Sequence, residues 1–250
     1  MIRITLGNVG SGKTATEVRE MITNPLKRLT YTNIQVIGEG TEHIKFLTPD
    51  MILTKTVKRT IHKKDGTNED VEEMSVNVDF WKSIKEPVNI VLDEAHTILN
   101  SRRSFSKKSI HLNHWLSLIR RVLGDTDGGN SEIVFISQLS NKLDCNLRQM
   151  AHNIRWNICH YQKVCSTCGI YWDETSDQPE LIYRCPRCSG IHIKKKNIRI
   201  QVLFFANIKK FEDYHDFGVQ SQYKEILVLD VEKYFYAYNS LQWDNLFNEY

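Results

Sequence analysis

Runs of apolar residues alternate with amphipathic helical patterns along this chain of 250 residues, which is typical of an α/β domain. The apolar run Ile2–Leu6 predicts a first strand, and the helical run Ala15–Ile22 follows it after a glycine-rich turn. The runs Pro87–Leu92 and Glu132–Gln138 consist largely of branched apolar residues, as expected of parallel strands that are buried on both faces. We therefore predict an α/β fold with a central, mostly parallel sheet flanked by helices.

The remaining pattern predicts further elements around this sheet. They are strands at Tyr31–Ile37, Ile154–Val164, Ile200–Phe205 and Glu225–Val231, and helices at His111–Leu123 and Leu143–Met150. Two polar, partly alternating runs, Lys55–Lys63 and Val71–Trp81, flank Asp65-Gly66 and predict a solvent-facing hairpin, with a pair of amphipathic helices as the alternative. The aromatic tail is expected to pack on the core through Tyr234, Phe235, Tyr236, Tyr238, Trp243 and Phe247.

The composition restricts the class of protein but does not indicate an activity. The net charge of +3 and the pI near 8.4 do not by themselves indicate a nucleic-acid-binding protein. No apolar run approaches the roughly 20 residues that span a bilayer, and the first strand is too short for a signal peptide. We expect a soluble, cytoplasmic protein with one main core and no membrane insertion.

The turn after the first strand has the sequence of a phosphate-binding loop, Gly-x-x-x-x-Gly-Lys-Thr. Glycines let the backbone approach an anion and direct successive N–H groups at its oxygens, and the following helix adds its positive N-terminal end. Lys13 would reach the β- and γ-phosphates and Thr14 would hold Mg²⁺. The predicted ATP-binding residues are Gly7, Asn8, Val9, Gly10, Ser11, Gly12, Lys13 and Thr14.

Two acids end the strand predicted at Pro87–Leu92, and His96 follows them to complete the letters DEAH. This arrangement is typical of a Walker B element, in which Asp93 binds the Mg²⁺ water shell and Glu94 acts as general base toward the attacking water. A helix N-terminus with capping acids is the structural alternative.

Further candidates lie downstream of the acids. Gln138, at the tip of its strand, could contact the γ-phosphate or the attacking water, or could be an ordinary loop glutamine. Arg120 and Arg121 could supply an arginine finger to a neighbouring subunit, or could merely favour a helix C-terminus. The basic loop Asn100–Ser109, which contains Phe105, fits a DNA-facing loop and a solvated surface loop equally well.

Four of the six cysteines form two Cys-x-x-Cys pairs separated by sixteen residues, which is the spacing of a zinc ribbon. Four thiolates leave no open position on Zn²⁺, so the predicted site is structural; a redox pair is the alternative. The predicted ligands are Cys165, Cys168, Cys185 and Cys188. We divide the chain into an ATPase core (1–164), a ribbon insertion (165–190) and a segment that completes the core and ends in the aromatic tail (191–250).

The order of these motifs resembles the FtsK/HerA superfamily of P-loop ATPases, and most closely its zonula occludens toxin-like and viral DNA-packaging branch. The resemblance covers about residues 1–160 and includes the Asp-Glu-Ala-His strand, the Arg-Arg helix, the Ile-Ser-Gln strand and Leu-Asp-x-x-Leu-Arg. It implies a RecA-like sheet, a homo-oligomeric ring that is often a hexamer, and ATP-driven movement of double-stranded DNA in viral genome packaging or phage morphogenesis, with a capsid protein as a further partner. It also implies that Gln138 is a sensor and that Arg120 or Arg121 is the finger in trans. Phage morphogenesis members usually carry a membrane segment after the ATPase domain, so the lack of one here favours a packaging-type motor.

Two other classes compete with a motor. Type II thymidine kinases also join a P-loop and an Asp-Glu-Ala-Gln strand to a four-cysteine zinc lobe, but His96 replaces that glutamine here and the gap between the cysteine pairs is shorter. The other class is a nucleotide-dependent DNA-binding switch or assembly scaffold that hydrolyses little ATP. The function of such a protein would barely change in a Glu94→Gln variant.

Overall fold

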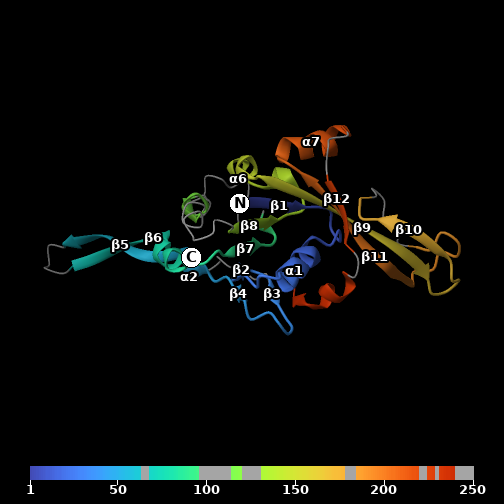
Figure 1. Cartoon of the computed structure of the whole chain (residues 1–250), viewed down its shortest axis with the longest axis horizontal. Helices are drawn as coiled ribbons and strands as arrows, with labels where there is room; N and C mark the ends of the chain where they lie inside the picture. Colours follow the sequence, from blue (N-terminus) through green and yellow to red (C-terminus); the bar gives the residue numbers. More distant parts are fainter. Residues whose placement is uncertain are drawn as a thin grey trace.

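A computed structural model describes residues 1–62, 68–95, 114–119, 131–177, 184–219, 224–228 and 231–239, with backbone only at 56–62, 68–74 and 227. Nine of the described strands form one sheet, in the order β12-β11-β9-β1-β8-β7-β2-β4 with β10 paired to β9 (Figure 1). These strands are β1 Ile2–Leu6, β2 Thr30–Thr32, β4 Ile44–Phe46, β7 Asn89–Leu92, β8 Glu132–Ile136, β9 Asn153–Cys165, β10 Tyr171–Thr175, β11 Ile193–Phe205 and β12 Lys224–Val228.

The six strands from β9 to β4 run parallel, which confirms the predicted mostly parallel sheet. Successive branched apolar residues of these strands point to opposite faces of the sheet, and other elements pack on both faces. Val91 and Val134 pack with Val18 of α1 (Lys13–Thr23) on one face. The other face carries a larger cluster that includes residues of α6 (Cys145–Met150), α7 (Ile208–Phe217) and the helical residues 114–119. Every residue of β1 is buried, because helices cover both sides of the sheet at its centre.

The polar segment after α2 (Pro49–Ile52) forms the antiparallel hairpin β5 (Leu53–His62) and β6 (Asn68–Val76). The predicted hairpin is therefore confirmed and the pair of helices is wrong; the turn residues Asp65-Gly66 lie outside the described residues. The hairpin projects from one end of the molecule (Figure 1). Beyond β6 the chain forms α3 (Val78–Ser83) instead of continuing as strand, because Asn77 accepts a hydrogen bond from the Phe80 N–H and caps a helix there.

The strand predicted at Tyr31–Ile37 is interrupted. β2 ends at Thr32, and the next two-residue strand, β3 (Gln35–Val36), pairs with β13 (Tyr238–Asn239) outside the main sheet. The interruption falls at Asn33, whose side chain bonds to the neighbouring β7 segment instead of continuing the strand.

The tail packs on the core only in part. Tyr234, in the 3₁₀ segment η3 (Glu232–Tyr236), is buried, as predicted. Tyr236 is 87% exposed, so the prediction that it packs on the core is wrong. Trp243 and Phe247 lie outside the described residues. None of the helices in the described part of the chain combines the length and apolar character needed to cross a bilayer.

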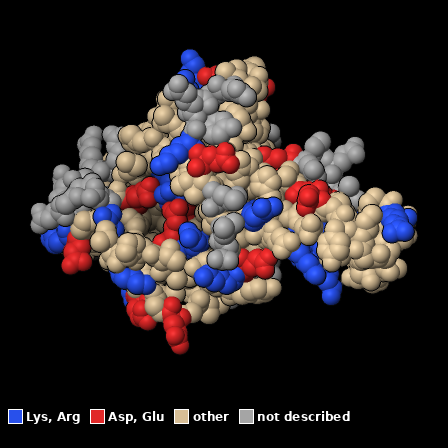
Figure 2. All heavy atoms as spheres, turned by 45° about the vertical axis from the view of Figure 1, so that its right-hand side comes forward, with Lys and Arg blue, Asp and Glu red and all other residues tan. Residues whose placement is uncertain are grey.

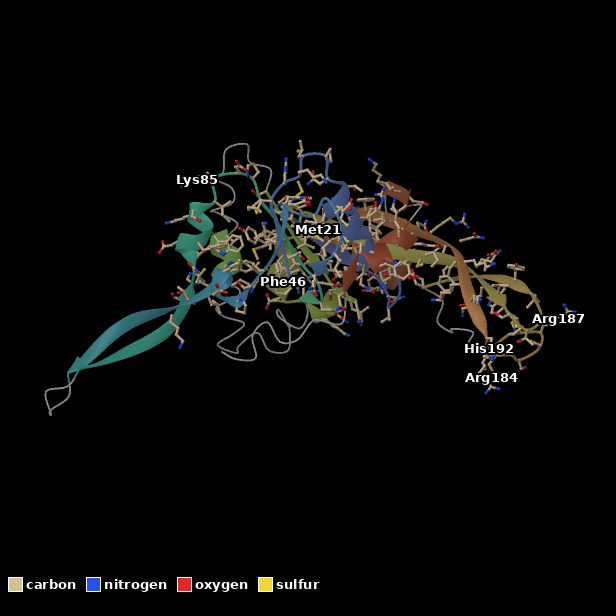
Figure 3. All side chains as sticks on the ribbon, turned by 90° about the horizontal axis from the view of Figure 1, so that it is seen from below. Met21, Phe46, Lys85, Arg184, Arg187 and His192 are labelled. Carbon is tan, nitrogen blue, oxygen red and sulfur yellow. The ribbon has the colours of Figure 1, made fainter. Side chains whose placement is uncertain are left out.

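Strands β9 and β11 extend together beyond the main sheet, with β10 beside β9, and form a projecting arm at the end opposite the β5–β6 hairpin (Figure 1). We call this part, residues 160–177 and 184–199, the arm. Both Cys-x-x-Cys pairs lie at its far end, near the tip marked by Arg184, Arg187 and His192 in Figure 3. The division of the chain at residues 164 and 190 stays a prediction.

Candidate nucleotide site

The glycine-rich loop joins the end of β1 to the start of α1. Gly12 stands at the N-cap of α1 with a left-handed φ of 79°. A Cβ at this position would lie 2.1 Å from Cδ1 of Ile200 on β11, so a side chain here would collide with the Ile200 side chain unless that side chain moved. The loop is closed by a hydrogen bond from the Ser11 N–H to the Asn8 carbonyl at 3.1 Å, while Val9 at its tip is 78% exposed. The sequence thus forms the compact strand–loop–helix turn that anion binding requires.

The Lys13 ammonium lies over this loop. Its Nζ donates to the carbonyl oxygens of Gly7 at 2.7 Å and Asn8 at 3.0 Å. Burial lowers the pKa of Lys13, and the nearby carboxylates of Asp93 and Glu94 oppose that shift. The lysine and the two predicted Walker B acids are therefore close enough to interact electrostatically.

Thr14 and Asp93 bring the ends of β1 and β7 together. The Thr14 hydroxyl donates to Oδ2 of Asp93 at 2.8 Å. Burial raises the pKa of Asp93 to about 6, although the Thr14 hydrogen bond and the Lys13 charge both act in the opposite direction. A hydroxyl and a carboxylate side by side next to a lysine form a suitable oxygen donor pair for a divalent cation.

Asn33 holds Asp93 from the other side, and the sequence did not indicate this. Its Oδ1 accepts from the Asp93 N–H at 2.8 Å, and its Nδ2 donates to the Asp93 carbonyl at 3.1 Å. Two hydrogen bonds from one amide fix the backbone at the end of β7. An asparagine inside a predicted strand was the available signal, because asparagine disfavours strands.

Glu94 adopts a left-handed backbone conformation with φ of 49°, which is unusual for a residue with a side chain. Its N–H donates to Oδ1 of Asp93 at 2.8 Å. The chain therefore turns sharply after the strand, and such strain is commonly retained at functional sites. His96, Arg120, Arg121 and the loop at 100–109 lie outside the described residues.

Gln138 follows β8, the strand that lies between β1 and β7. The Ser137 N–H donates to the Thr5 carbonyl at 3.0 Å, which keeps the segment aligned with β1 up to that point. Gln138 is half-buried at the same edge of the sheet as Thr14 and Asp93. The parallel topology thus gathers the described candidates at one edge.

Comparison with known proteins agrees with this arrangement. The family model described as zonular occludens toxin (Zot) matches residues 1–170. The chain belongs to the zonular occludens toxin family. None of the curated proteins matches this sequence.

Solved structures show weaker similarity to this Zot-family chain. The N-terminal domain of zonular occludens toxin from Neisseria meningitidis has 17% identity and a TM-score of 0.46, over 95% of this chain and 98% of that one. The genome packaging NTPase B204 from Sulfolobus turreted icosahedral virus 2, in complex with ATP-gammaS, has 12% identity and a TM-score of 0.36, over 62% of this chain and 74% of that one. The same NTPase in complex with AMPPCP gives the same values.

The arm of this Zot-family protein touches the phosphate loop. Nδ2 of Asn8 donates to the Ser176 carbonyl and to Oδ1 of Asp177, both at 3.3 Å, where the chain leaves β10. Oδ2 of Asp177 accepts in turn from the Trp156 indole at 2.9 Å. These contacts join segments far apart in sequence, so no local motif could have revealed them.

Two further residues, Arg148 and Cys145, lie away from the nucleotide site and the cysteine cluster in their contacts. Arg148 forms a 3.1 Å ion pair with Glu212 of α7 within the chain. Cys145, which begins α6, is an exposed thiol, whereas Cys159 of β9 is buried.

The four predicted metal ligands form a compact cluster. The sulfur atoms of Cys165, Cys168, Cys185 and Cys188 all lie within 4.8 Å of one another. The two Cys-x-x-Cys turns share one backbone pattern: the first cysteine's carbonyl accepts from the N–H four residues later, and its N–H donates to the carbonyl five residues later.

Backbone N–H groups of Cys168 and Thr167 also point at the Cys165 sulfur and lower its pKa to about 6. Thiolates bind metal ions, and four sulfur atoms within 4.8 Å of one another could hold a four-coordinate metal ion.

Proposed function

We propose that this Zot-family P-loop NTPase hydrolyses ATP and uses the reaction to move DNA. The observation that carries the proposal is the 2.8 Å hydrogen bond from Thr14 to Asp93, which joins the phosphate loop to the acid-bearing strand. Because Lys13 lies beside the same pair, one small volume contains a cation for phosphate, an oxygen pair for a metal and a second acid, Glu94.

Each residue has a distinct role in this proposal. The N–H groups of Gly10–Thr14 bind the phosphates, and Lys13 leaves the loop carbonyls to contact the terminal phosphate. Thr14 and Asp93 would hold Mg²⁺, which neutralises charge that develops on the phosphate oxygens. Glu94 takes the proton of the attacking water, and Gln138 orients that water or contacts the γ-phosphate.

The proposal also includes a homo-oligomeric assembly and a DNA substrate. Family membership, and the resemblance of the motifs to packaging ATPases, support a homo-oligomeric ring, with six subunits as our expectation. Arg120 or Arg121 would then contact the γ-phosphate of the next subunit, so that hydrolysis changes the interface and the segments that grip double-stranded DNA. Viral genome packaging or phage morphogenesis, with a capsid protein as partner, is the setting that we propose.

We also propose that the cysteine cluster binds Zn²⁺. The donor set supports it, because four sulfurs from two matching turns provide a tetrahedral shell without an open position. The ion would be structural and would hold the end of the arm.

The function is tested by measuring phosphate release from Mg·ATP with and without linear double-stranded DNA, alongside thymidine phosphorylation. We expect DNA to stimulate turnover, Lys13→Ala to abolish it, and Glu94→Gln to bind ATP normally without hydrolysing it. The exposed Lys85→Ala serves as the control and should match the wild type. Phosphorylated thymidine would select a kinase, and wild-type turnover of Glu94→Gln would contradict the assigned general base.

The ring is tested by mixing two inactive variants. Arg120→Ala and Arg121→Ala subunits each retain Glu94, whereas Glu94→Gln subunits retain both arginines. Mixtures should recover activity if an arginine acts across an interface. Failure to recover activity with both arginine variants would contradict a finger in trans.

A further inference from the structure

The three strands of the arm present two very different faces. On one face, Lys163 forms a 2.6 Å ion pair with Glu174, and both side chains are buried. The Trp172 indole donates to the same carboxylate at 2.8 Å, and the Lys195 ammonium lies 4.1 Å from the centre of the Tyr161 ring. Charges on this closed face are therefore satisfied within the arm.

The register of the strands defines the opposite, open face. Val164 of β9 pairs with Tyr171 of β10 on one side and with Lys194 of β11 on the other, so these three residues share a row. The next two rows consist of Asp173, Gln162 and Lys196, and of Thr175, His160 and Arg199. A groove of about 360 Å³ is lined by five residues of these last two rows, His160, Gln162, Asp173, Thr175 and Arg199, together with Tyr161, Glu174 and Asn197.

Cations follow one edge of this open face. Lys194, Lys196 and Arg199 are exposed on β11, and no ion pair holds them among the residues that the structure describes. Lys194 and Lys196 are two strand residues apart, which separates their Cα atoms by about 6.6 Å. Within the described arm, seven lysines and arginines stand against three acids, and one of those acids is Glu174, already paired to Lys163.

The positive charge continues to the end of the arm. Arg184 and Arg187 are exposed near the cysteine cluster, at the tip seen in Figure 3. Lysine and arginine side chains are also visible over this end of the molecule in Figure 2. Exposed cations therefore lie both at the tip of the arm and along β11 toward the main sheet.

An aromatic ring faces this row of cations across the arm. Tyr171 is 54% exposed on β10, about 10 Å from the β11 backbone because one strand lies between them. Gln162, Thr175 and Asn197 add uncharged hydrogen-bonding groups to the groove on the same arm. A row of cations beside an exposed ring is the combination that binds an unpaired nucleic-acid strand, with phosphates on the cations and a base on the ring.

We propose that the open face of the arm is a binding site for single-stranded nucleic acid. The strand's phosphates contact Lys194, Lys196 and Arg199, and one base stacks on Tyr171. Asp173 can accept a hydrogen bond from a base amino group, whereas an anionic lipid surface would meet its charge unfavourably. None of these residues is assigned a role in the nucleotide site, so this binding does not require ATP hydrolysis and the proposal goes beyond the proposed function.

The test measures binding of a fluorescent 30-nucleotide oligo(dT) to the full chain by anisotropy at several salt concentrations. K194E/K196E/R199E should weaken binding at least tenfold and reduce the slope of log K against log salt by about 2, since each lost phosphate contact contributes about 0.7. Tyr171→Ala should weaken binding about tenfold through the lost stacking. The matched controls are K82E/K85E/K209E, which reverses three exposed lysines elsewhere, and Tyr236→Ala at an exposed tyrosine outside the arm.

Photocrosslinking of an oligonucleotide containing 5-iodouracil, with the modified peptide mapped by mass spectrometry, locates the contact directly. A crosslink at Tyr171 would support the site, and a crosslink confined to the main sheet would overturn it. Equal affinity of the wild type and the triple arm variant would also overturn it, as would binding of phosphatidylglycerol vesicles but not of the oligonucleotide. Loss of binding with unchanged ATPase activity in the absence of DNA would separate this site from the proposed motor chemistry.

Discussion

Asn33 and Asp93 are joined by two hydrogen bonds between the Asn33 side chain and the Asp93 backbone, at 2.8 and 3.1 Å. The amide comes from the end of β2 and the acid from the end of the adjacent strand β7. By holding the Asp93 backbone, Asn33 fixes the orientation of the carboxylate that accepts a hydrogen bond from Thr14. Neither of the two Asn33 hydrogen bonds reaches the phosphate loop itself.

Asn33→Ala should lower ATP turnover about tenfold or more, because the Asp93 backbone loses both side-chain partners and the carboxylate loses its fixed direction. The free energy of unfolding should fall by about 1–3 kcal/mol. Steady-state ATPase kinetics and urea denaturation measure the two effects.

Asn77→Ala is the matched control for this variant. The Asn77 side chain also makes two backbone hydrogen bonds, accepting from Phe80 and donating to Asp50, but away from the nucleotide site. It should lose similar stability and keep its turnover. Equal turnover in both variants would contradict the role of Asn33 in positioning Asp93.

Gly12→Ala should destabilise the protein by more than Gly10→Ala, although both positions have a left-handed φ, 79° and 77°. A Cβ at Gly10 meets nothing within 4 Å, so backbone strain alone applies, at about 1–2 kcal/mol. A Cβ at Gly12 also collides with Ile200. Urea denaturation should rank the two variants, and adding Ile200→Ala to Gly12→Ala should relieve the collision; equal costs for the two single variants would contradict it.

Glu17 stabilises the core through a buried charge network, and its contribution should depend on pH. The carboxylate accepts from Arg3 and Thr5, both at 2.6 Å, and Arg155 lies 3.7 Å away. Burial alone would raise the pKa of Glu17, but the charges of Arg3 and Arg155 outweigh burial and lower it below its usual value near 4.5.

A lowered carboxylate pKa gives stability that is present above the unfolded-state pKa and is lost as pH falls through the folded-state value. Glu17→Gln should therefore cost about 3 kcal/mol at pH 7 and progressively less below about pH 4.5. Thermal melts from pH 3 to pH 8 measure this. A cost that does not change with pH would contradict an electrostatic role.

Purified protein should contain one zinc ion per chain. Cys168→Ser should remove the ion and make the arm sensitive to proteolysis, because the two turns would no longer be linked at one centre. Cys145→Ser, at an exposed thiol outside the cluster, should retain the metal. Elemental analysis and limited proteolysis provide the measurements, and metal-free wild-type protein would contradict the assignment.

Local sequence pattern predicted the elements whose own residues determine them. Branched apolar runs predicted β1, β7 and β8, and the glycine-lysine-threonine signature predicted the loop between β1 and α1. The β5–β6 hairpin followed from its alternating pattern in the same way.

Features that depend on partners distant in sequence were missed. β2 stops at Thr32 because Asn33 bonds to a strand sixty residues away. Asn8 contacts Ser176 and Asp177 only because the arm folds back on the phosphate loop. The register that places Tyr171 in one row with Lys194 also becomes visible only when three strands are paired.

One strand connects the phosphate loop to the cysteine cluster. Trp156 of β9 pairs with Leu6 at the entrance of the loop, and Cys165 ends the same strand nine residues later, about 30 Å away. β11 pairs with β9 along most of this length, which stiffens the connection. β9 is therefore a continuous connection between the nucleotide site and the cysteine cluster. A tilt of about 5° at the loop would swing the tip by roughly 3 Å over that length.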